Sequence, residues 1–235
     1  LAVSDGKDGL MIISFALFKY FPYGGLQRNF LNIAKSCHER GHEVHAYVGQ
    51  WEGDLPEWLN CHQLGLHGLS NHARARNFSR SLTAALLSRQ TDVVVGFNRL
   101  PGLDVYYAAD PCFAQKSYED HGRWFRWTAR YRTYAAYEKA VYGKGSSTQI
   151  LAVSEAQVPH FRKWYETPEE RFHVLPPGIS RDRMAGENAA SLRAGLRSHL
   201  GIRDDEHVLL MVGSGFRTKG VYRAVIMLAQ LTASM

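Results

Sequence analysis

The sequence predicts an α/β fold with a doubly wound parallel sheet, on three observations. Short, continuously apolar runs recur along the chain, stretches with apolar residues at helical spacing separate them, and glycine or proline follows several of the runs. Continuous apolar runs are typical of strands that are buried on both faces of a parallel sheet. Strands separated by helices form right-handed βαβ units, which bind ligands at the carboxyl ends of their strands.

The first such unit lies near the start of the chain. Leu10–Phe18 is a short apolar run and is predicted as a buried strand. From Leu26 the apolar residues recur at helical spacing up to Gly41, and glycine commonly ends a helix. Glu43–Val48 is predicted as the second strand.

The alternation continues for most of the chain. Helices are predicted at Ser79–Arg89, at Tyr118–Tyr142 and from Ser154 to about Tyr165, and strands are predicted at Asp92–Phe97, Asp104–Ala109, Gln149–Val153 and Phe172–Leu175.

A polar stretch rich in Arg, Asn, Ser and Gly divides the chain into two regions. We expect a first domain at residues 1–178, a linker at 179–205 with a helical patch near Ser191–Leu200, and the start of a second domain at 206–235. This last part contains a predicted strand, Val208–Val212, and a predicted helix from about Val221. One strand and one helix cannot bury both faces of a sheet, so the second domain is expected to be truncated.

The composition is that of a globular protein with an anionic partner. Apolar residues make up 45% of the chain, and 28 Lys and Arg face 22 Asp and Glu, which suggests phosphate or another anion as ligand. The three cysteines form no CxxC pair and no HExxH motif occurs, so we expect neither a disulfide framework nor a metal site. The longest apolar run has nine residues, whereas a membrane-spanning helix needs about 20.

Two glycine-containing loops lie between a predicted strand and a predicted helix. Gly24-Gly25 would leave bare backbone N–H groups at the positive end of a helix dipole, where phosphate binds well. The loop GSGFRTKG, residues 213–220, brings Arg217 and Lys219 to a similar position, although it is neither a GxGxxG motif nor a P-loop. Taken alone, each loop could equally be an ordinary turn. Because two such loops occur, an ordinary turn is the less favoured explanation for both.

Asp110 follows a predicted strand and directly precedes Pro111. Two interpretations stay open. The carboxylate could be a catalytic group at the carboxyl end of the strand, or it could cap a helix, because Asp is favoured at the N-cap and Pro at the first helical position.

Residues 116–144 combine seven cations with three acidic residues and many aromatic residues. Basic and aromatic side chains together favour an anionic membrane surface. The same residues could stack nucleic-acid bases, or the aromatic residues could pack on the sheet while the arginines are solvated. The predicted membrane-contact residues are Arg123, Trp124, Arg126, Trp127 and Arg130, of which the arginines would form one stripe of a continuous helix.

Four spaced blocks of the sequence, in order, together resemble glycosyltransferase family 4. They are MIISFALFKYFPYGGLQRNFLNIAKSCHERGHEVHAYV, VVVGFNRLPGLDVYYAADPCFA, LAVSEAQVPHFRKWYETPEERFHVLPPGI and LLMVGSGFRTKGVYRAV, and they run from about Met11 to about Ala224. The resemblance is to members that build the lipopolysaccharide core of Gram-negative bacteria. It implies a GT-B fold, with a complete N-terminal Rossmann-like domain and the first β-α unit of a truncated C-terminal Rossmann-like domain.

The resemblance implies retaining transfer of glucose from UDP-glucose to an inner-core heptose, without a metal ion or other cofactor. The implied partners are a nucleotide sugar, a lipopolysaccharide inner-core acceptor and the anionic inner-membrane surface, with no nucleic acid. The implied location is cytoplasmic, peripheral on the cytoplasmic face of the inner membrane.

The resemblance also implies roles for single residues. Asp110 stands where the family places a polar active-site residue. Without a metal, cations and helix-terminal amides would have to stabilise the negative charge that develops on the departing UDP. Attack by a carboxylate nucleophile and front-face attack within an ion pair both stay open. The residues implied on the donor side are Gly24, Gly25, Arg183, Arg217 and Lys219.

The family's second domain normally continues with a Glu-x7-Glu segment that holds the donor sugar and the ribose. That segment would lie beyond Met235, so we expect this chain alone to bind UDP-glucose weakly and to turn over little. The alternatives are a non-catalytic membrane-docking or acceptor-binding module, and a transferase with a different sugar donor.

Overall fold

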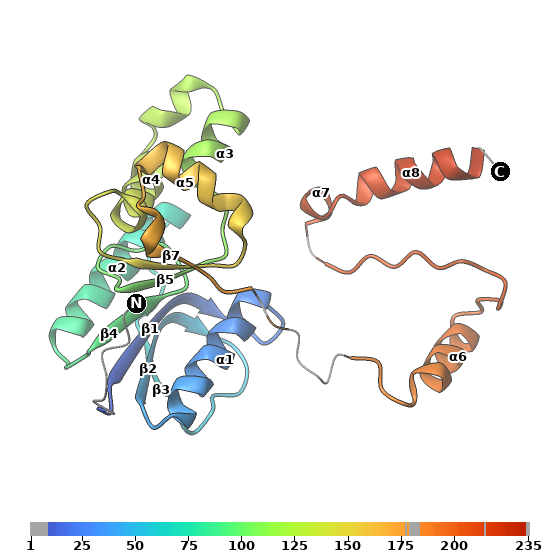
Figure 1. Ribbon diagram of the computed structural model, residues 1–235, viewed down its shortest axis with the longest axis horizontal. Helices are drawn as coiled ribbons and strands as arrows, with labels where there is room; N and C mark the ends of the chain where they lie inside the picture. The colour runs from blue at the N-terminus through green and yellow to red at the C-terminus, as the bar shows by residue number, and fades with distance from the viewer. Residues whose placement is uncertain (1–8, 177, 179–183, 214, 234–235) are drawn as a thin grey trace. The chain divides into compact units, whose positions relative to one another are not determined.

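The computed structural model describes residues 9–176, 178, 184–213 and 215–233, and Figure 1 shows its helices and strands. The chain divides into two compact units, Leu1–Gly178 and Ile179–Met235, which are called unit 1 and unit 2 and are described separately. All described strands belong to unit 1, whereas the regular elements described in unit 2 are helices.

Seven strands form one parallel sheet in unit 1, in the order β3-β2-β1-β4-β5-β6-β7. The chain winds outward in both directions from β1, as in other doubly wound folds, so the predicted α/β class is confirmed. The strands are β1 (Ile12–Tyr20), β2 (Glu43–Trp51), β3 (Asn60–Gln63), β4 (Val93–Gly96), β5 (Val105–Ala108), β6 (Gln149–Ala152) and β7 (Phe172–Val174).

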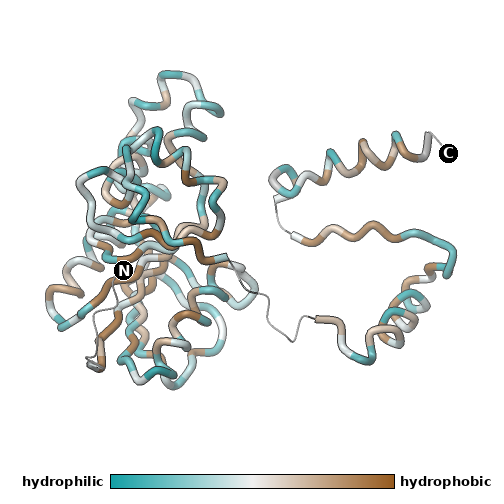
Figure 2. The backbone as a smooth tube through the Cα atoms, in the orientation of Figure 1, coloured by the Kyte–Doolittle hydropathy of each residue, from teal (hydrophilic) through white to brown (hydrophobic). Residues whose placement is uncertain are grey.

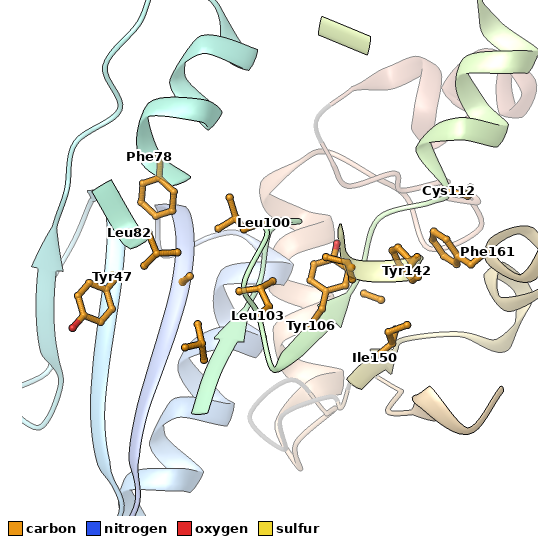
Figure 3. Close-up of a cluster of buried hydrophobic side chains, with 14 of the residues drawn as sticks. Tyr47, Phe78, Leu82, Leu100, Leu103, Tyr106, Cys112, Tyr142, Ile150 and Phe161 are labelled. Carbon is orange, nitrogen blue, oxygen red and sulfur yellow. The ribbon is translucent and has the colours of Figure 1, made fainter. Parts of the chain in front are cut away.

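Helices cover both faces of this sheet. Successive residues of a strand point to opposite faces, and Phe15 and Ala16 of β1 accordingly belong to two different buried clusters. On one face, Phe15 meets Phe30 of α1 edge to face, with ring centroids 5.9 Å apart. Figure 3 shows the cluster on the other face, and Figure 2 shows that hydrophobic residues concentrate along the strands. The helices that supply these clusters are α1 (Gly25–Glu39), α2 (Asn71–Leu87), α3 (Phe113–Asp120), α4 (Ala129–Tyr142) and α5 (Val158–Tyr165).

Several elements differ from the sequence prediction in extent, and one strand was not predicted. The helix α2 was predicted from Ser79 but begins at Asn71, because the Ser70 side chain caps it by accepting a hydrogen bond from the Ala73 N–H, at 3.3 Å. The strand β3 was not predicted, because its residues NCHQ contain no apolar run. Two short 3-10 helices complete the connections, η2 (Glu155–Gln157) and η3 (Glu169–Arg171).

The predicted single helix Tyr118–Tyr142 is wrong. The chain is extended at Gly122 and again at Thr128, whose side chain accepts a hydrogen bond from the Tyr131 N–H at 3.1 Å. Thr128 is therefore the N-cap of a new helix, and the predicted arginine stripe is divided between two elements. The region holds α3 (Phe113–Asp120), the 3-10 helix η1 (Arg123–Trp127) and α4.

Unit 2 contains three described helices, α6 (Ala189–His199), α7 (Phe216–Lys219) and α8 (Val221–Ala233). The helices predicted near Ser191–Leu200 and from Val221 are confirmed. The predicted strand Val208–Val212 is wrong, because no second strand among the described residues pairs with its backbone. The apolar side chains of this segment are exposed.

Candidate functional site

The candidate site lies at the carboxyl edge of the sheet around β1 and β4. β1 has β2 on one side and β4 on the other, and doubly wound folds bind ligands at such a reversal of strand order. Asn98, which follows β4, connects the two strands, because its Oδ1 accepts a hydrogen bond from the Phe18 N–H at 2.7 Å. Asp110 follows β5, two strands away from β1, or about 10 Å along the same edge.

The two glycines that follow β1 have different structural environments. A Cβ atom on Gly24 would lie 1.8 Å from Oε1 of Gln27, so packing around the start of α1 explains this glycine. A Cβ atom on Gly25 would meet no atom within 4 Å, so nothing in the described chain explains why residue 25 lacks a side chain. Gly25 is the first residue of α1, whose N-terminus has no side-chain cap. A bare backbone at a helix N-terminus suits a bound phosphate.

Asp110 does not cap a helix, so that interpretation is wrong. The N-cap of α3 is Cys112, and its side chain makes no capping hydrogen bond. The Asp110 residue is exposed, and its carboxylate makes no hydrogen bond or ion pair within the described part of the chain. Its backbone carbonyl instead accepts a hydrogen bond from Nη2 of Arg99, at 3.1 Å. The carboxylate is thus free to face a ligand.

A buried ion pair next to Asp110 was missed by the sequence reasoning. Nη1 of Arg99 lies 2.7 Å from Oε1 of Glu138, whose side chain is fully buried. Glu138 also accepts a hydrogen bond from the Tyr165 hydroxyl at 2.6 Å. A signal was present, because Glu138 shares a helical stripe with the buried residues Val141 and Tyr142. A carboxylate on such a stripe indicates a buried partner.

Burial, helped by the charge of Glu138, keeps two neighbouring groups protonated. Burial, together with the charge of Glu138, raises the pKa of the Cys112 thiol to about 11. Burial and the same carboxylate also raise the pKa of the Tyr165 hydroxyl above its usual value, so this group stays a hydrogen-bond donor. Nearby, Nε of Arg99 and the hydroxyls of Tyr106 and Tyr142 are buried without a hydrogen-bond partner in the described chain.

The residues of η1 and the start of α4 form a largely exposed surface, called here the aromatic-basic segment (residues 123–130). Trp124 and Trp127 are 69% and 77% exposed, so the interpretation that these tryptophans pack on the sheet is wrong. Phe125 is the buried aromatic residue of η1. The tyrosines of α4 do pack inward, and Tyr142 is fully buried. The arginines of the segment are exposed in both η1 and α4.

A hollow of about 440 Å³ lies beside the aromatic-basic segment. The guanidinium of Arg126 lies over the ring of Tyr118, with its carbon 5.5 Å from the ring centroid. The hollow is lined by Tyr118, His121, Gly122, Arg123 and Arg126. Its cationic lining suits an anion.

In unit 2, glycines with positive φ flank the predicted cations of the GSGFRTKG loop. Gly215 and Gly220 have left-handed conformations and bound the short helix α7. A Cβ atom on Gly213 would lie 3.0 Å from Cε of Lys219, so the lysine side chain lies close to the loop backbone. Arg217 and Lys219 are both exposed. Arg183, the remaining predicted donor-side cation, lies outside the described residues.

The described residues hold neither a metal-binding cluster nor a membrane-spanning helix. In the part of the chain that the structure describes, no group of three or more His, Cys, Asp or Glu side chains is arranged to hold a metal ion. Among the helices so described, none is both long enough and apolar enough to cross a membrane.

Comparisons with known proteins identify the family. The lipopolysaccharide glucosyltransferase WaaG of Escherichia coli (strain K12) is 43% identical over 225 residues, which are 96% of this chain and 60% of that protein. The crystal structure of WaaG, described as a glycosyltransferase involved in lipopolysaccharide biosynthesis, matches with a TM-score of 0.86 at 43% identity and covers 92% of this chain and 59% of the solved chain.

The chain therefore spans about 60% of the length of these relatives. The structural likeness confirms the predicted α/β fold of GT-B type. Residues 23–183, more than half of the chain, match the family described as Glycosyltransferase Family 4. From the sequence match and the shared fold together, this chain belongs to glycosyltransferase family 4.

Proposed function

We propose that this chain is part of a retaining glucosyltransferase that moves glucose from UDP-glucose to an inner-core heptose of lipopolysaccharide. The observation on which this proposal rests is the 43% identity, over nearly the whole chain, to a relative named as a lipopolysaccharide glucosyltransferase. In this proposal residues 1–178 are the acceptor-side domain, 179–205 are a linker, and 206–235 begin the donor-binding domain.

The donor diphosphate is proposed to bind at the Gly24-Gly25 turn. The empty space around the missing Cβ of Gly25 supports this, because a ligand phosphate can approach the helix N-terminus there without a clash. Arg183, Arg217 and Lys219 are the proposed cations for the charge that develops on UDP as the glycosidic bond breaks. These cations would stabilise that negative charge without a metal ion.

The acceptor is proposed to meet the chain at Asp110 while the aromatic-basic segment lies on the membrane. The exposed carboxylate of Asp110 is available to a sugar hydroxyl, and its position at the carboxyl edge of the sheet supports an active-site role. The exposed Trp124 and Trp127 beside arginines suit an anionic lipid surface. The proposed location is thus the cytoplasmic face of the inner membrane, with no nucleic-acid partner.

The test of this function is sugar transfer to lipopolysaccharide that ends in the inner-core heptose. The chain and the E. coli relative are incubated in parallel with UDP-glucose or UDP-galactose, with and without EDTA, and the product is analysed by mass spectrometry. We expect glucose to be preferred and EDTA to have no effect. Preferential transfer of galactose, or transfer abolished by EDTA, contradicts the proposed donor or the metal-free mechanism.

Acceptor binding is measured separately, because it does not require turnover. The chain is titrated with heptose-terminated lipopolysaccharide and with the glucosylated form, and we expect tighter binding of the unglucosylated acceptor. The exposed tryptophans also favour a second candidate, a docking or acceptor-binding module without catalysis. Acceptor and vesicle binding without any binding of UDP-glucose to the chain supports that candidate instead.

A further inference from the structure

The backbone on both sides of Asp110 is held by side chains that are distant in the sequence. Residues 110–114 are called here the Asp110 segment. Nη2 of Arg99 donates hydrogen bonds to the carbonyls of Asp110 and Pro111, at 3.1 Å and 2.5 Å. The N–H of Cys112 donates to Oε1 of Gln157 at 3.3 Å. These partners come from the β4–β5 connection and from η2, so the segment takes its path from its surroundings.

The helix α3, which begins within this segment, has no side-chain cap from its own residues. The carboxylate of Glu138, on α4, accepts hydrogen bonds from the N–H groups of Phe113 and Ala114, at 2.7 Å and 2.9 Å. These are the first two N–H groups of α3, which have no partner within the helix and lie where negative charge is favoured. Glu138 therefore acts as the cap of α3 from another helix.

Stability alone is a poor explanation for this arrangement. The side chain of Arg99 is 13% exposed and that of Glu138 is fully buried, and removing two charges from water generally offsets the attraction between them. A buried ion pair is better attested as a device that selects one arrangement of the chain. Here the selected arrangement is the path of the Asp110 segment.

The same helix is joined to the aromatic-basic segment. α4 begins directly after η1, and the ring of Tyr131 in its first turn contacts Phe125 of η1, with centroids 5.8 Å apart. The Tyr131 ring also contacts Phe113 of α3, at 5.7 Å. Aromatic packing and the Glu138 carboxylate thus form a continuous path from the exposed surface to the Asp110 segment.

We infer that Arg99 and Glu138 are positioning residues, which hold the Asp110 segment in place and couple its order to the contact that the aromatic-basic segment makes with a lipid surface. This inference rests on the proposed function, because it uses membrane docking and the active-site role of Asp110. Neither Arg99 nor Glu138 is assigned a contact with substrate.

Amide hydrogen exchange on the full chain tests the inference, with and without vesicles of phosphatidylethanolamine and phosphatidylglycerol. The variants are Glu138→Gln, which removes the carboxylate charge, and Arg99→Lys, which keeps a positive charge but cannot contact Glu138 and the two carbonyls through separate nitrogens. The matched control is Glu166→Gln, whose carboxylate pairs with Lys144 at the surface, where both side chains are 74% exposed.

Without vesicles, we expect Glu138→Gln and Arg99→Lys to speed exchange in the Asp110 segment about tenfold or more, and exchange in β1 to change much less. With vesicles, exchange should slow in both the aromatic-basic segment and the Asp110 segment of the unaltered chain and of the control. In the two test variants it should slow in the aromatic-basic segment alone. This vesicle-dependent difference is the readout that a merely structural pair would not give.

Two results overturn the inference in different ways. Vesicle protection of the aromatic-basic segment without any change in the Asp110 segment of the unaltered chain leaves the docking proposal intact and refutes the coupling. No vesicle protection of either segment refutes the docking proposal and the coupling together. If Glu138→Gln does not fold, the unaltered chain and Arg99→Lys give the same decision.

Discussion

The Gly24-Gly25 turn allows a paired prediction, because the same substitution should have opposite effects at two adjacent residues. In Gly24→Ala, the new methyl group would lie 1.8 Å from Oε1 and 2.6 Å from Cδ of Gln27, and 2.8 Å from Cε2 of Phe21. In Gly25→Ala, the methyl group would meet no atom within 4 Å. Both residues have negative φ, so neither substitution places alanine in the left-handed region.

The magnitudes follow from these contacts. To relieve the clash in Gly24→Ala, the buried Gln27 side chain must move and give up its Nε2 hydrogen bond to the Lys19 carbonyl, worth about 1 kcal/mol. Displacing well-packed neighbours costs about 1–3 kcal/mol more. A loss of about 3 kcal/mol lowers the Tm of a chain of this size by about 6–12 °C. Gly25→Ala should instead raise stability by about 0.4–1 kcal/mol, because alanine restricts the unfolded chain.

Thermal and urea unfolding of the two variants measure these effects, and ligand-observed NMR with UDP-glucose measures the donor site. We expect Gly25→Ala to weaken UDP-glucose binding about tenfold or more while leaving the fold at least as stable. A destabilised Gly25→Ala variant refutes the structural reasoning. A stable Gly25→Ala variant with unchanged UDP-glucose binding refutes the assignment of this turn to the donor diphosphate.

Three further predictions concern lipid binding, pH and buried hydroxyls. Serine at all three arginines of the aromatic-basic segment should weaken co-sedimentation with phosphatidylglycerol vesicles about 100-fold, at about 1 kcal/mol per arginine. The control variant has the same net charge, because serine replaces three exposed cations elsewhere on unit 1, namely Lys35, Arg40 and Arg80. Its binding to the vesicles should persist. Burial, and then the charges of Arg89 and His45, lower the pKa of His62 below 6.5 in the folded chain. As the pH falls, the unfolded chain therefore binds a proton at His62 before the folded chain does. The free energy of unfolding should accordingly fall as the pH drops below about 6.5. In urea titrations this fall should be smaller in His62→Gln, and an identical pH dependence in both proteins rejects the assignment. Tyr142→Phe removes a buried hydroxyl that has no hydrogen-bond partner among the described residues, and it should raise the Tm by about 2–4 °C. Tyr165→Phe removes a donor to Glu138 and should lower the Tm. Calorimetric shifts of the same sign in both tyrosine variants contradict this reasoning.

Much of the fold of unit 1 could be predicted because its strands are buried on both faces. The runs that became β1 and β4 are apolar enough to be recognised without any knowledge of their neighbours. The strand β3 was not predicted, because it lies at the edge of the sheet and its residues are polar. Val208–Val212 shows the opposite error, because an apolar run becomes a strand only where another strand pairs with its backbone.

The candidate site was harder to predict than the fold. Gly25 and Asp110 could be found because Gly25 lies in the loop between a predicted strand and a predicted helix, and Asp110 directly follows a predicted strand. The helical stripe around Glu138 indicates a buried partner, but Arg99 lies 39 positions away and nothing in the sequence identifies it as that partner. Thr128, a residue type favoured at the N-cap, was a local signal for the break in the long helix, but the prediction of a single helix did not use it.

The uneven burial of the five tryptophans has an optical consequence. Trp124 and Trp127 face solvent, whereas Trp51 and Trp58 stack on aromatic neighbours and the indole N–H of Trp164 is hydrogen-bonded. Solvent-facing indoles emit at longer wavelengths and are reached by dissolved quenchers, while packed indoles are shielded. The unlabelled chain thus carries two fluorophores on the surface proposed to meet lipid, and brominated lipids can report how deeply that surface enters a bilayer.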